Sequence, residues 1–329
     1  MGALTLGLVV PVTTSVQGES SAQAAPSTCL DAQLRTVADI REAARELGYE
    51  VELVALPEAA SAEMATSIMR RRLGHADRVL VIGHGEAVGH GKIHALARSC
   101  GLPVLGPDGL AVALSDDKLL SRRALANHNI AVPRSVSLRE PDAQSLGRLG
   151  WPRVLKPRSG GFGQGVERLS SSEQLDDALE RAAESDTELL LERELVGREV
   201  SVVVLDGQVL GTAELERRFT DAGVETTQMS CPAPLDTISL AGVENMALRS
   251  CAALGLGRGP TRVDIIMSER HNEVVLEVEA LPPLHRDSVV ARVARAAGHS
   301  YSQLLTKLLG PAPRPRVRRS ASVAAQLHA

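Results

Sequence analysis

Apolar extended segments alternate with amphipathic helical segments over the first hundred residues. Leu4–Val10, Val51–Leu56 and Arg78–Ile82 are short apolar runs typical of buried strands, and Ala32–Leu47 repeats its apolar residues at helical spacing. Strands that alternate with helices pair in parallel, because each helix carries the chain back across the sheet. The sequence therefore predicts an N-terminal parallel α/β domain, which we place at residues 1–108.

The later part of the chain shows more strands in direct succession. Asp206 and Gly207 form a turn dipeptide between two apolar segments, which predicts a hairpin. Arg262–Met267 and Glu273–Val278 are expected to form another hairpin, and one helix is predicted from about Ser288 to Leu309. Residues 311–329 are rich in Pro, Arg and Ala, and we expect them to form a disordered tail.

Charge and composition exclude several classes of partner. The 36 basic and 40 acidic residues give a net charge of −4, and aromatic residues make up 2% of the chain, so we expect no nucleic-acid partner. The apolar segment Leu4–Val12 is too short to span a membrane, and no Lys or Arg precedes Arg35 to start a signal peptide. With four widely spaced cysteines as well, we expect a cytoplasmic protein without membrane association.

A glycine-rich segment follows one of the four lysines. Lys156 ends a predicted strand, and the glycine-rich residues Ser159–Gly165 follow after Pro157 and Arg158. Such a loop can turn backbone N–H groups inward around an anion, with the ammonium as a compact positive charge. The order of residues fits neither a Walker A loop nor a dinucleotide-binding loop. Taken alone, a glycine-rich hairpin with a chance lysine explains the segment equally well.

The segment Glu192–Glu199 joins two predicted strands. Backbone groups exposed between strands suit the edge of an adenine, and the Glu199 carboxylate can accept hydrogen bonds from ribose hydroxyls. By itself, a charged surface loop is the simpler interpretation.

Three carboxylates are expected on one face of the last predicted hairpin. Arg262 and Asp264 share a face of its first strand, and the acidic side chains of Glu277 and Glu279 share a face of its second. Buried carboxylates brought together in this way repel one another unless a divalent cation compensates them, and hard oxygen ligands favour Mg²⁺. The alternative is an exposed strand with scattered acids, which the apolar flanking residues disfavour.

Ser288 precedes the apolar residues of the last predicted helix. Free N–H groups at the start of this helix can hold a substrate carboxylate. A plain capping serine is an equally good interpretation.

Taken in order, these elements resemble the ATP-grasp superfamily, and most of all D-alanine–D-alanine ligases. The resemblance extends from about Arg78 to Leu309, with a looser match at the N-terminus. It implies an α/β protein with an α+β ATP-grasp part, in which a central subdomain (109–190) and a C-terminal subdomain with the metal site (191–310) clamp the nucleotide. The segments that carry it are HGEAVGHGKIHALARSCGLPVLGPDGLAVALSDDKLLSRRAL, VLKPRSGGFGQGV, LLLERELVGREVSVVVL, TTQMSCPAPL and TRVDIIMSERHNEVVLEVEALPPLHRDSV.

The resemblance assigns a role to each candidate residue. ATP phosphates would contact Lys118 and Lys156 and lie under a flap at Gly161–Gly165, which includes Gly161, Phe162 and Gly163; adenine would bind at Glu192 and Leu195, and ribose at Glu199. The magnesium ligands would be Asp264, Glu277 and Glu279, with Mn²⁺ as another suitable ion. Arg262 would stabilise the oxyanion, and Ser288 would hold the carboxylate of the acceptor.

The activity implied is an ATP-dependent carboxylate–amine ligase. A small-molecule carboxylate would attack the γ-phosphate to give an acyl phosphate, and an amine would then displace phosphate to give an amide or dipeptide. The substrates would be amino-acid-like, and a homodimer is compatible with the resemblance.

The sequence departs from the pattern of the family at several positions. Glu279 stands where asparagine is usual, and Pro283 stands where a glycine would offer an N–H to the oxyanion. Phe162 and Phe219 are the two phenylalanines, and we expect them to pack together when the flap closes. The acidic donor-site segment reads Val88–Gly91 here, and Glu19 is a weak replacement, so we expect a donor other than D-alanine.

Two other functions stay open on the sequence alone. The first is a degenerate ATP-grasp module that binds nucleotide without turnover, which the replacements at Glu279 and Pro283 motivate. The second is a carboxylase-type ATP-grasp enzyme, which the glycine-dense flap suggests but for which the chain has no biotin-carrier part.

Overall fold

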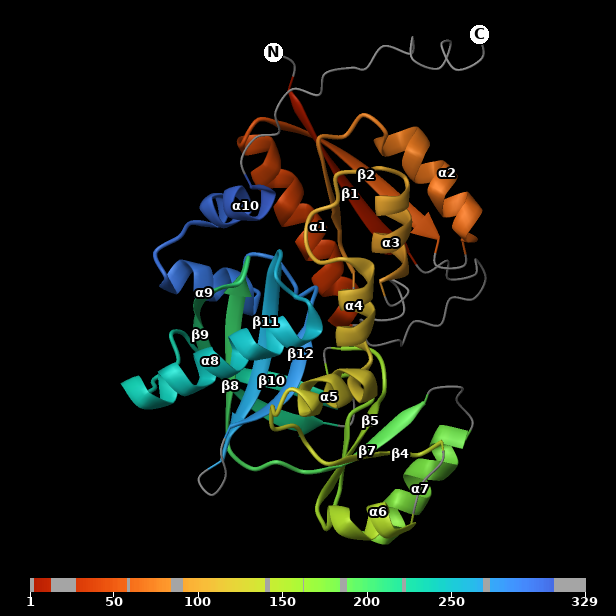
Figure 1. Ribbon diagram of the computed structural model, residues 1–329, viewed down its shortest axis with the longest axis vertical. Coiled ribbons are helices and arrows are strands. Elements are labelled where there is room, and N and C mark those ends of the chain that lie inside the picture. The colour runs from red at the N-terminus through yellow and green to blue at the C-terminus, as the bar shows by residue number, and fades with distance from the viewer. Residues whose placement is uncertain are drawn as a thin grey trace.

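Three β-sheets organise the part of the chain that the structure describes (Figure 1). In this computed structural model, the described residues are 3–12, 28–57, 60–83, 91–139, 143–161, 163–183, 188–220, 223–268 and 273–310. The tail predicted at 311–329 lies outside them, as does Phe162. No described helix has the length and apolar character needed to cross a bilayer.

The N-terminal sheet is parallel, as predicted, with strand order β2-β1-β3. Its central strand β1 reads LTLGLVVPV and is buried over most of its length, which is typical of a parallel strand covered on both faces. The strands are β1 (Leu4–Val12), β2 (Tyr49–Pro57) and β3 (Arg78–Val81), and the helices of this part are α1 (Thr28–Glu46), α2 (Ala62–Leu73) and α3 (Lys92–Ser99).

A four-stranded antiparallel sheet forms the lower unit in Figure 1, with strand order β4-β7-β5-β6. Helices α6 and α7 cover it, and Leu155 and Leu191 lie in the small core between them. The elements here are α4 (Gly109–Asp116), α5 (Lys118–Asn127), β4 (Ser135–Ser137), α6 (Ala143–Leu149), β5 (Arg153–Pro157), β6 (Glu167–Leu169), α7 (Ser172–Ala183) and β7 (Leu189–Arg193).

The third sheet is antiparallel and has the order β10-β9-β8-β11-β12. The Asp206–Gly207 turn joins β8 to β9 with both residues at positive φ, 50° and 76°, as the hairpin prediction required. The predicted pairing of β11 with β12 is also confirmed. The elements are β8 (Arg198–Leu205), β9 (Gln208–Thr220), β10 (Gly223–Ser230), α8 (Thr237–Leu254), β11 (Pro260–Met267) and β12 (Val274–Glu279).

The single helix predicted at Ser288–Leu309 was wrong, because two helices occupy this region: α9 (Val289–Ala296) and α10 (Tyr301–Leu309). Gly298 has a φ of +84°, which ends a right-handed helix, and Ser300 starts the next one with a capping box. One hydrophobic core joins α9 and α10 to α1, β1 and the five-stranded sheet. The two ends of the described chain are therefore packed together.

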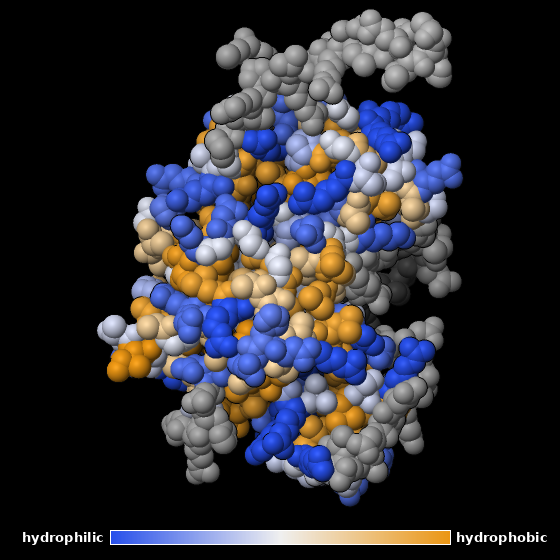
Figure 2. Space-filling model, viewed as in Figure 1, coloured by the Kyte–Doolittle hydropathy of each residue, from blue (hydrophilic) through white to orange (hydrophobic). Residues whose placement is uncertain are grey.

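Hydropathy on the surface follows this packing. On the face shown in Figure 2, the broadest group of hydrophobic residues lies across the middle, at the level of α4 and α9 in Figure 1, and hydrophilic residues are mixed with smaller hydrophobic patches above and below it.

We expect Ile265→Ala to lower the free energy of unfolding by about 2–4 kcal/mol, because it removes a fully buried side chain and leaves a cavity. Ile265 is 0% exposed and lies under α8 in the core of the five-stranded sheet. Ile238→Ala is the matched control, since Ile238 is 85% exposed and should change stability little. Urea unfolding of both variants gives the measurement, and equal effects of the two would contradict the assigned core.

Candidate active site

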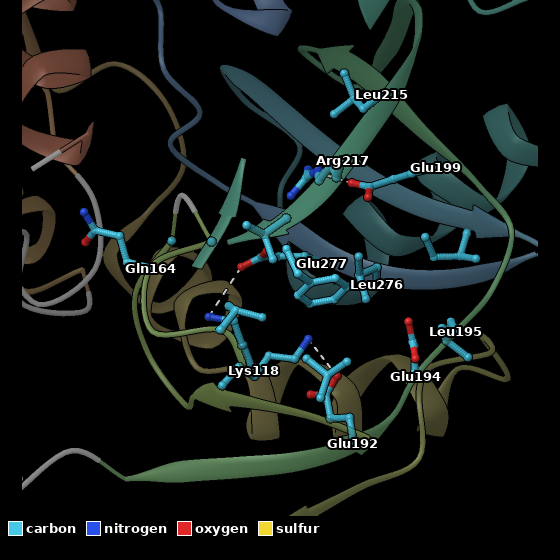
Figure 3. Close-up of a pocket in the computed structure, with 18 of the residues that line it drawn as sticks. Lys118, Gln164, Glu192, Glu194, Leu195, Glu199, Leu215, Arg217, Leu276 and Glu277 are labelled. Atoms are coloured by element: carbon cyan, nitrogen blue, oxygen red, sulfur yellow. Dashed lines mark ion pairs between the residues drawn. The ribbon is translucent and has the colours of Figure 1, made fainter. Parts of the chain in front are cut away.

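A cavity of about 550 Å³ lies between the four-stranded and five-stranded sheets. Figure 3 shows side chains from both sheets pointing into it. Its lining includes most of the residues that the sequence assigned to the nucleotide, namely Lys118, Lys156, Gly161, Gly163, Glu192, Leu195 and Glu199. Of the predicted metal ligands, Glu277 lines this cavity. Lys156 and Glu199 come from different sheets, so only the folded chain brings these segments to one place.

Lys118 reaches the cavity from the first turn of α5. Asp117 caps this helix through its side chain and also binds Arg158, which fixes the helix start to the end of β5. The Lys118 ammonium donates to the carbonyl of Gly160 at 2.6 Å and lies 3.5 Å from the Glu277 carboxylate (Figure 3). The helix start and the glycine-rich loop are therefore tied to the acidic strand β12 by one cation.

Lys156 is buried at the end of β5 and is paired with Glu192. Its ammonium lies 2.6 Å from Oε2 of Glu192, whose other oxygen pairs with the buried guanidinium of Arg122. Burial and the neighbouring Arg122 lower the pKa of Lys156, and the carboxylates of Glu277 and Glu199 oppose this by favouring the charged ammonium. Burial also lowers the pKa of Arg122, to about 10.

Sequence reasoning missed Arg122, and it gave Glu192 a place beside adenine without foreseeing what its carboxylate contacts. Both carboxylate oxygens of Glu192 already have cationic partners. Residues 194–197 run from β7 to β8, and Leu195 lines the cavity at this crossing. Glu194 and Gly197 of this crossing line the cavity as well.

The predicted acidic residues are cross-strand neighbours on one face of the sheet. Asp264 pairs with Glu277, and Arg262 pairs with Glu279. One Arg262 guanidinium nitrogen bridges Asp264 at 2.9 Å and Glu279 at 2.8 Å. Arg217, from β9, lies 3.4 Å from Asp264.

These cations correct the expectation that only a divalent ion compensates the carboxylates. Arginines and Lys118 neutralise them in this arrangement, because burial makes an uncompensated charge costly. Among the described residues, no three His, Cys, Asp or Glu side chains converge as a metal-binding group. The metal-ligand roles of Asp264, Glu277 and Glu279 stay predictions.

Burial and neighbouring charges give these carboxyl groups different acidities. Burial raises the pKa of Glu199 and of Glu279 to about 7 in each case, although arginines lie beside both. Burial also opposes ionisation of Asp264, but Arg262 and Arg217 outweigh it and lower the pKa. Lys118 and Lys156 do the same for Glu277. Asp264 and Glu277 are therefore the permanent anions of the group.

The glycine-rich loop is held to the hairpin β9–β10 by backbone contacts. The N–H of Val224 donates to the carbonyl of Gly163 at 3.0 Å, and Gln164 forms an antiparallel bridge with Gly223. A Cβ at Gly223 would lie 2.1 Å from the Gly163 carbonyl oxygen, so this approach requires glycine. Phe219 lines the cavity, but its predicted contact with Phe162 lies outside the described residues.

Ser288 caps α9 and does not line the cavity. Its hydroxyl accepts from the N–H of Ala291 at 3.2 Å, and the residue is buried. The loop before it is fixed to α1, since the N–H of Leu284 donates to Thr36 and that of Arg286 donates to Asp39. The capping role is therefore present, and the contact with an acceptor carboxylate stays a prediction.

Comparison with known proteins identifies the family of this chain. The family model described as D-ala D-ala ligase C-terminus matches residues 127–310. A D-alanine–D-alanine ligase of Saccharophagus degradans is 33% identical over 241 residues, which cover 71% of this chain and 76% of that protein. The chain belongs to the D-alanine–D-alanine ligase family. D-alanine–D-alanine ligase B of Pseudomonas putida is also 33% identical, over 242 residues that cover 71% of this chain and 76% of that protein.

Solved structures of this family share the fold. The D-alanine–D-alanine ligase of Bacillus anthracis complexed with ATP has a TM-score of 0.75 at 23% identity, covering 93% of this chain and 96% of that one. The VanG D-Ala:D-Ser ligase of Enterococcus faecalis has a TM-score of 0.74 at 21% identity, covering 94% and 99%. The ATP-grasp fold and the ATP-dependent ligase activity, which forms a carbon–nitrogen bond, are thereby confirmed.

We expect Gly223→Ala to weaken ATP binding about tenfold, because the added Cβ separates the hairpin from the glycine-rich loop and breaks their hydrogen bonds. Gly207→Ala is the control: this turn glycine also has positive φ but has nothing within 4 Å of an added Cβ. Calorimetric titration with ATP compares the two. Equal affinities would mean that the contact between loop and hairpin does not support nucleotide binding.

The acidity of Glu279 predicts a pH dependence of stability. Its pKa rises from 4.5 to about 7 on folding, so between these values the folded protein holds a proton that the unfolded chain has lost. Stability therefore falls as pH rises through this window. We expect Glu279→Gln to match the wild type near pH 5 and to exceed it by about 1–2 kcal/mol at pH 8.

Urea unfolding at both pH values measures this effect. Glu225→Gln is the control, because Glu225 pairs with Arg218 on the exposed hairpin. A Glu279→Gln variant whose advantage is the same at both pH values would contradict the raised pKa.

Proposed function

We propose that this ligase joins an amino-acid-like carboxylate to an amine through an acyl phosphate, with substrates other than a pair of D-alanines. The observation that carries the proposal is the distribution of charge across the cavity. Lys118 and Lys156 line the cavity, with Lys118 3.5 Å from Glu277, and Glu199 lines it from strand β8. This arrangement suits a triphosphate and its metal on the lysine side and ribose on the Glu199 side.

ATP would lie along the cavity in a defined direction. Adenine would meet the backbone of the crossing at residues 194–197, where Leu195 supplies an apolar contact. Ribose hydroxyls would donate to Glu199. The phosphates would contact both lysines under the loop that contains Gly161 and Gly163, where backbone N–H groups and ammonium ions favour negative charge.

The acidic residues of β11 and β12 would hold Mg²⁺, or Mn²⁺ in its place. Their oxygen donors are the kind that these ions prefer, and Oε2 of Glu279 is buried without a hydrogen-bond partner among the described residues. Bound there, the ion would neutralise phosphate charge. The ligands supplied by the chain would be Asp264, Glu277 and Glu279.

The chemistry then depends mainly on positioning. A carboxylate oxygen forms a bond to the γ-phosphorus while the bond to the β–γ bridging oxygen breaks, which gives an acyl phosphate and ADP. An amine then forms a bond to the acyl carbon, and phosphate leaves. Lys118 and Lys156 would hold the phosphates, Arg262 would face the tetrahedral oxyanion, and Ser288 would orient the acceptor.

The loop after β12 supports substrates different from those of the named relatives. Pro283 has no N–H to offer the oxyanion, and Glu279 adds a negative charge beside the phosphates. Leu281 and Glu279 line a small cavity next to Gly161 on the phosphate side. The structural neighbour named D-Ala:D-Ser ligase has the same fold, so this fold serves more than one acceptor.

We also propose a cytoplasmic location and a homodimer. The free thiols of Cys100, Cys231 and Cys251 support the first, since a reducing compartment keeps thiols unpaired. Gel filtration with light scattering tests the second.

A substrate screen tests the proposed function. The protein is incubated with ATP, Mg²⁺ and panels of D- and L-amino acids and small amines, and ADP and product mass are measured. We expect ADP formation that depends on one carboxylate and one amine. ATP binding without turnover across the panel would favour the nucleotide-binding module instead.

Lys156→Ala and Asp264→Ala should each abolish ADP formation, because they remove the phosphate cation and a metal ligand. Lys307→Ala is the control, since Lys307 is exposed on α10 and does not line the cavity. Full activity of either cavity variant would contradict the site assignment.

A further inference from the structure

Arg217 reaches from β9 into the cavity and lies between two carboxylates that the proposed function gives to different parts of ATP. One of its guanidinium nitrogens is 2.6 Å from Glu199, the ribose carboxylate, and 3.4 Å from Asp264, a metal ligand. Figure 3 shows its guanidinium directed toward Glu199. No role was predicted for this residue from the sequence.

Asp264 is saturated in this arrangement. Its Oδ1 accepts from Ser201 at 2.5 Å and from Arg262 at 3.0 Å. Its Oδ2 accepts from Arg262 at 2.9 Å and from Arg217 at 3.4 Å. A metal ion that uses Asp264 therefore needs one of these guanidinium groups to move.

Arg217 is the arginine more able to move. Arg262 makes several hydrogen bonds to Asp264 and a further one to Glu279, all on its own pair of strands. Arg217 makes one long contact with Asp264 and one ion pair with Glu199, and its Nε is buried without a hydrogen-bond partner among the described residues. It also belongs to the hairpin that contacts the glycine-rich loop, the part expected to respond to nucleotide.

Nucleotide gives this guanidinium a better partner. A guanidinium has five donors in a planar fork that matches phosphate oxygens. Arg217 lines the same cavity as the phosphate lysines Lys118 and Lys156. ATP also competes for Glu199, since the ribose hydroxyls need the oxygen that Arg217 now contacts.

We propose that Arg217 has two positions: without nucleotide it takes the place of the divalent cation beside Asp264, and with nucleotide it binds the phosphate chain and releases both carboxylates. This inference rests on the proposed function. The exchange makes metal binding depend on nucleotide. Without nucleotide, Arg217 competes with the metal ion for Asp264, and with nucleotide bound, the same side chain contacts the phosphates. Arg217 is then a nucleotide-binding residue as well as a barrier to free metal ions.

Two binding measurements on Arg217→Gln test the exchange. Mn²⁺ binding to the nucleotide-free protein is followed by electron paramagnetic resonance, and ATP binding is followed by calorimetry in EDTA, without metal. We expect Mn²⁺ to bind about tenfold more tightly and ATP about tenfold more weakly than in the wild type, since one guanidinium contact is lost from each side of the exchange. Opposite signs are the distinguishing result, because a merely structural role would weaken both.

Arg218→Gln is the matched control. Arg218 is the next residue of β9, its side chain is 69% exposed, and it pairs with Glu225 away from the cavity. It should leave both affinities at wild-type values. Arg217→Lys keeps the charge with a single ammonium and should fall between the wild type and Arg217→Gln in both measurements; it replaces the Gln variant if circular dichroism shows that variant unfolded.

The outcomes separate this inference from the proposed function. Wild-type protein that binds no ATP would refute the proposed function and the inference together. Wild-type protein that binds ATP, with Arg217 variants that leave either affinity unchanged or move both in one direction, would refute the inference alone.

Discussion

Charge compensation inside one cavity is the interaction on which the structure of this ligase depends. Lys118 approaches Glu277, Lys156 approaches Glu192, and arginines approach the remaining carboxylates. Each of these charges would be unstable if it were buried without a partner, because it would lose its hydration and gain no compensating interaction. Lys156 and Glu192 meet on adjacent strands of the four-stranded sheet, and Arg262 and Glu279 meet on adjacent strands of the five-stranded sheet. Lys118 reaches from helix α5 to Glu277 on β12, so this ion pair joins the two parts.

Local elements hold the facing sheets in place. Residues 194–197 carry the chain from one sheet directly to the other, so β7 and β8 border the same cavity. Asp117 and Arg158 fix the start of α5 to the end of β5. The glycine-rich loop is joined to the hairpin β9–β10 by a backbone hydrogen bond, and helices α9 and α10 join the five-stranded sheet to the N-terminal sheet.

Much of the candidate site was predictable from short sequence patterns. A lysine followed by glycines identified Lys156, and alternation along two strands identified Asp264 and Glu277. Arg217 and Arg122 could not be found in this way, because only four of the 36 basic residues are lysines and one arginine among the rest is inconspicuous. The break between α9 and α10 was not predicted, because apolar residues recur at helical spacing on both sides of Gly298 and indicated one continuous helix.

The sequence by itself determined many of the strand and helix segments, the family, and the face on which each acidic residue lies, since side chains alternate along a strand whatever surrounds it. Only the tertiary structure decided which cation meets which carboxylate. Arg217 and Asp264 are 47 positions apart, and Arg122 and Glu192 are 70 apart. Ion pairs need contact within a few ångströms in a buried environment, and separation along the chain does not fix that distance.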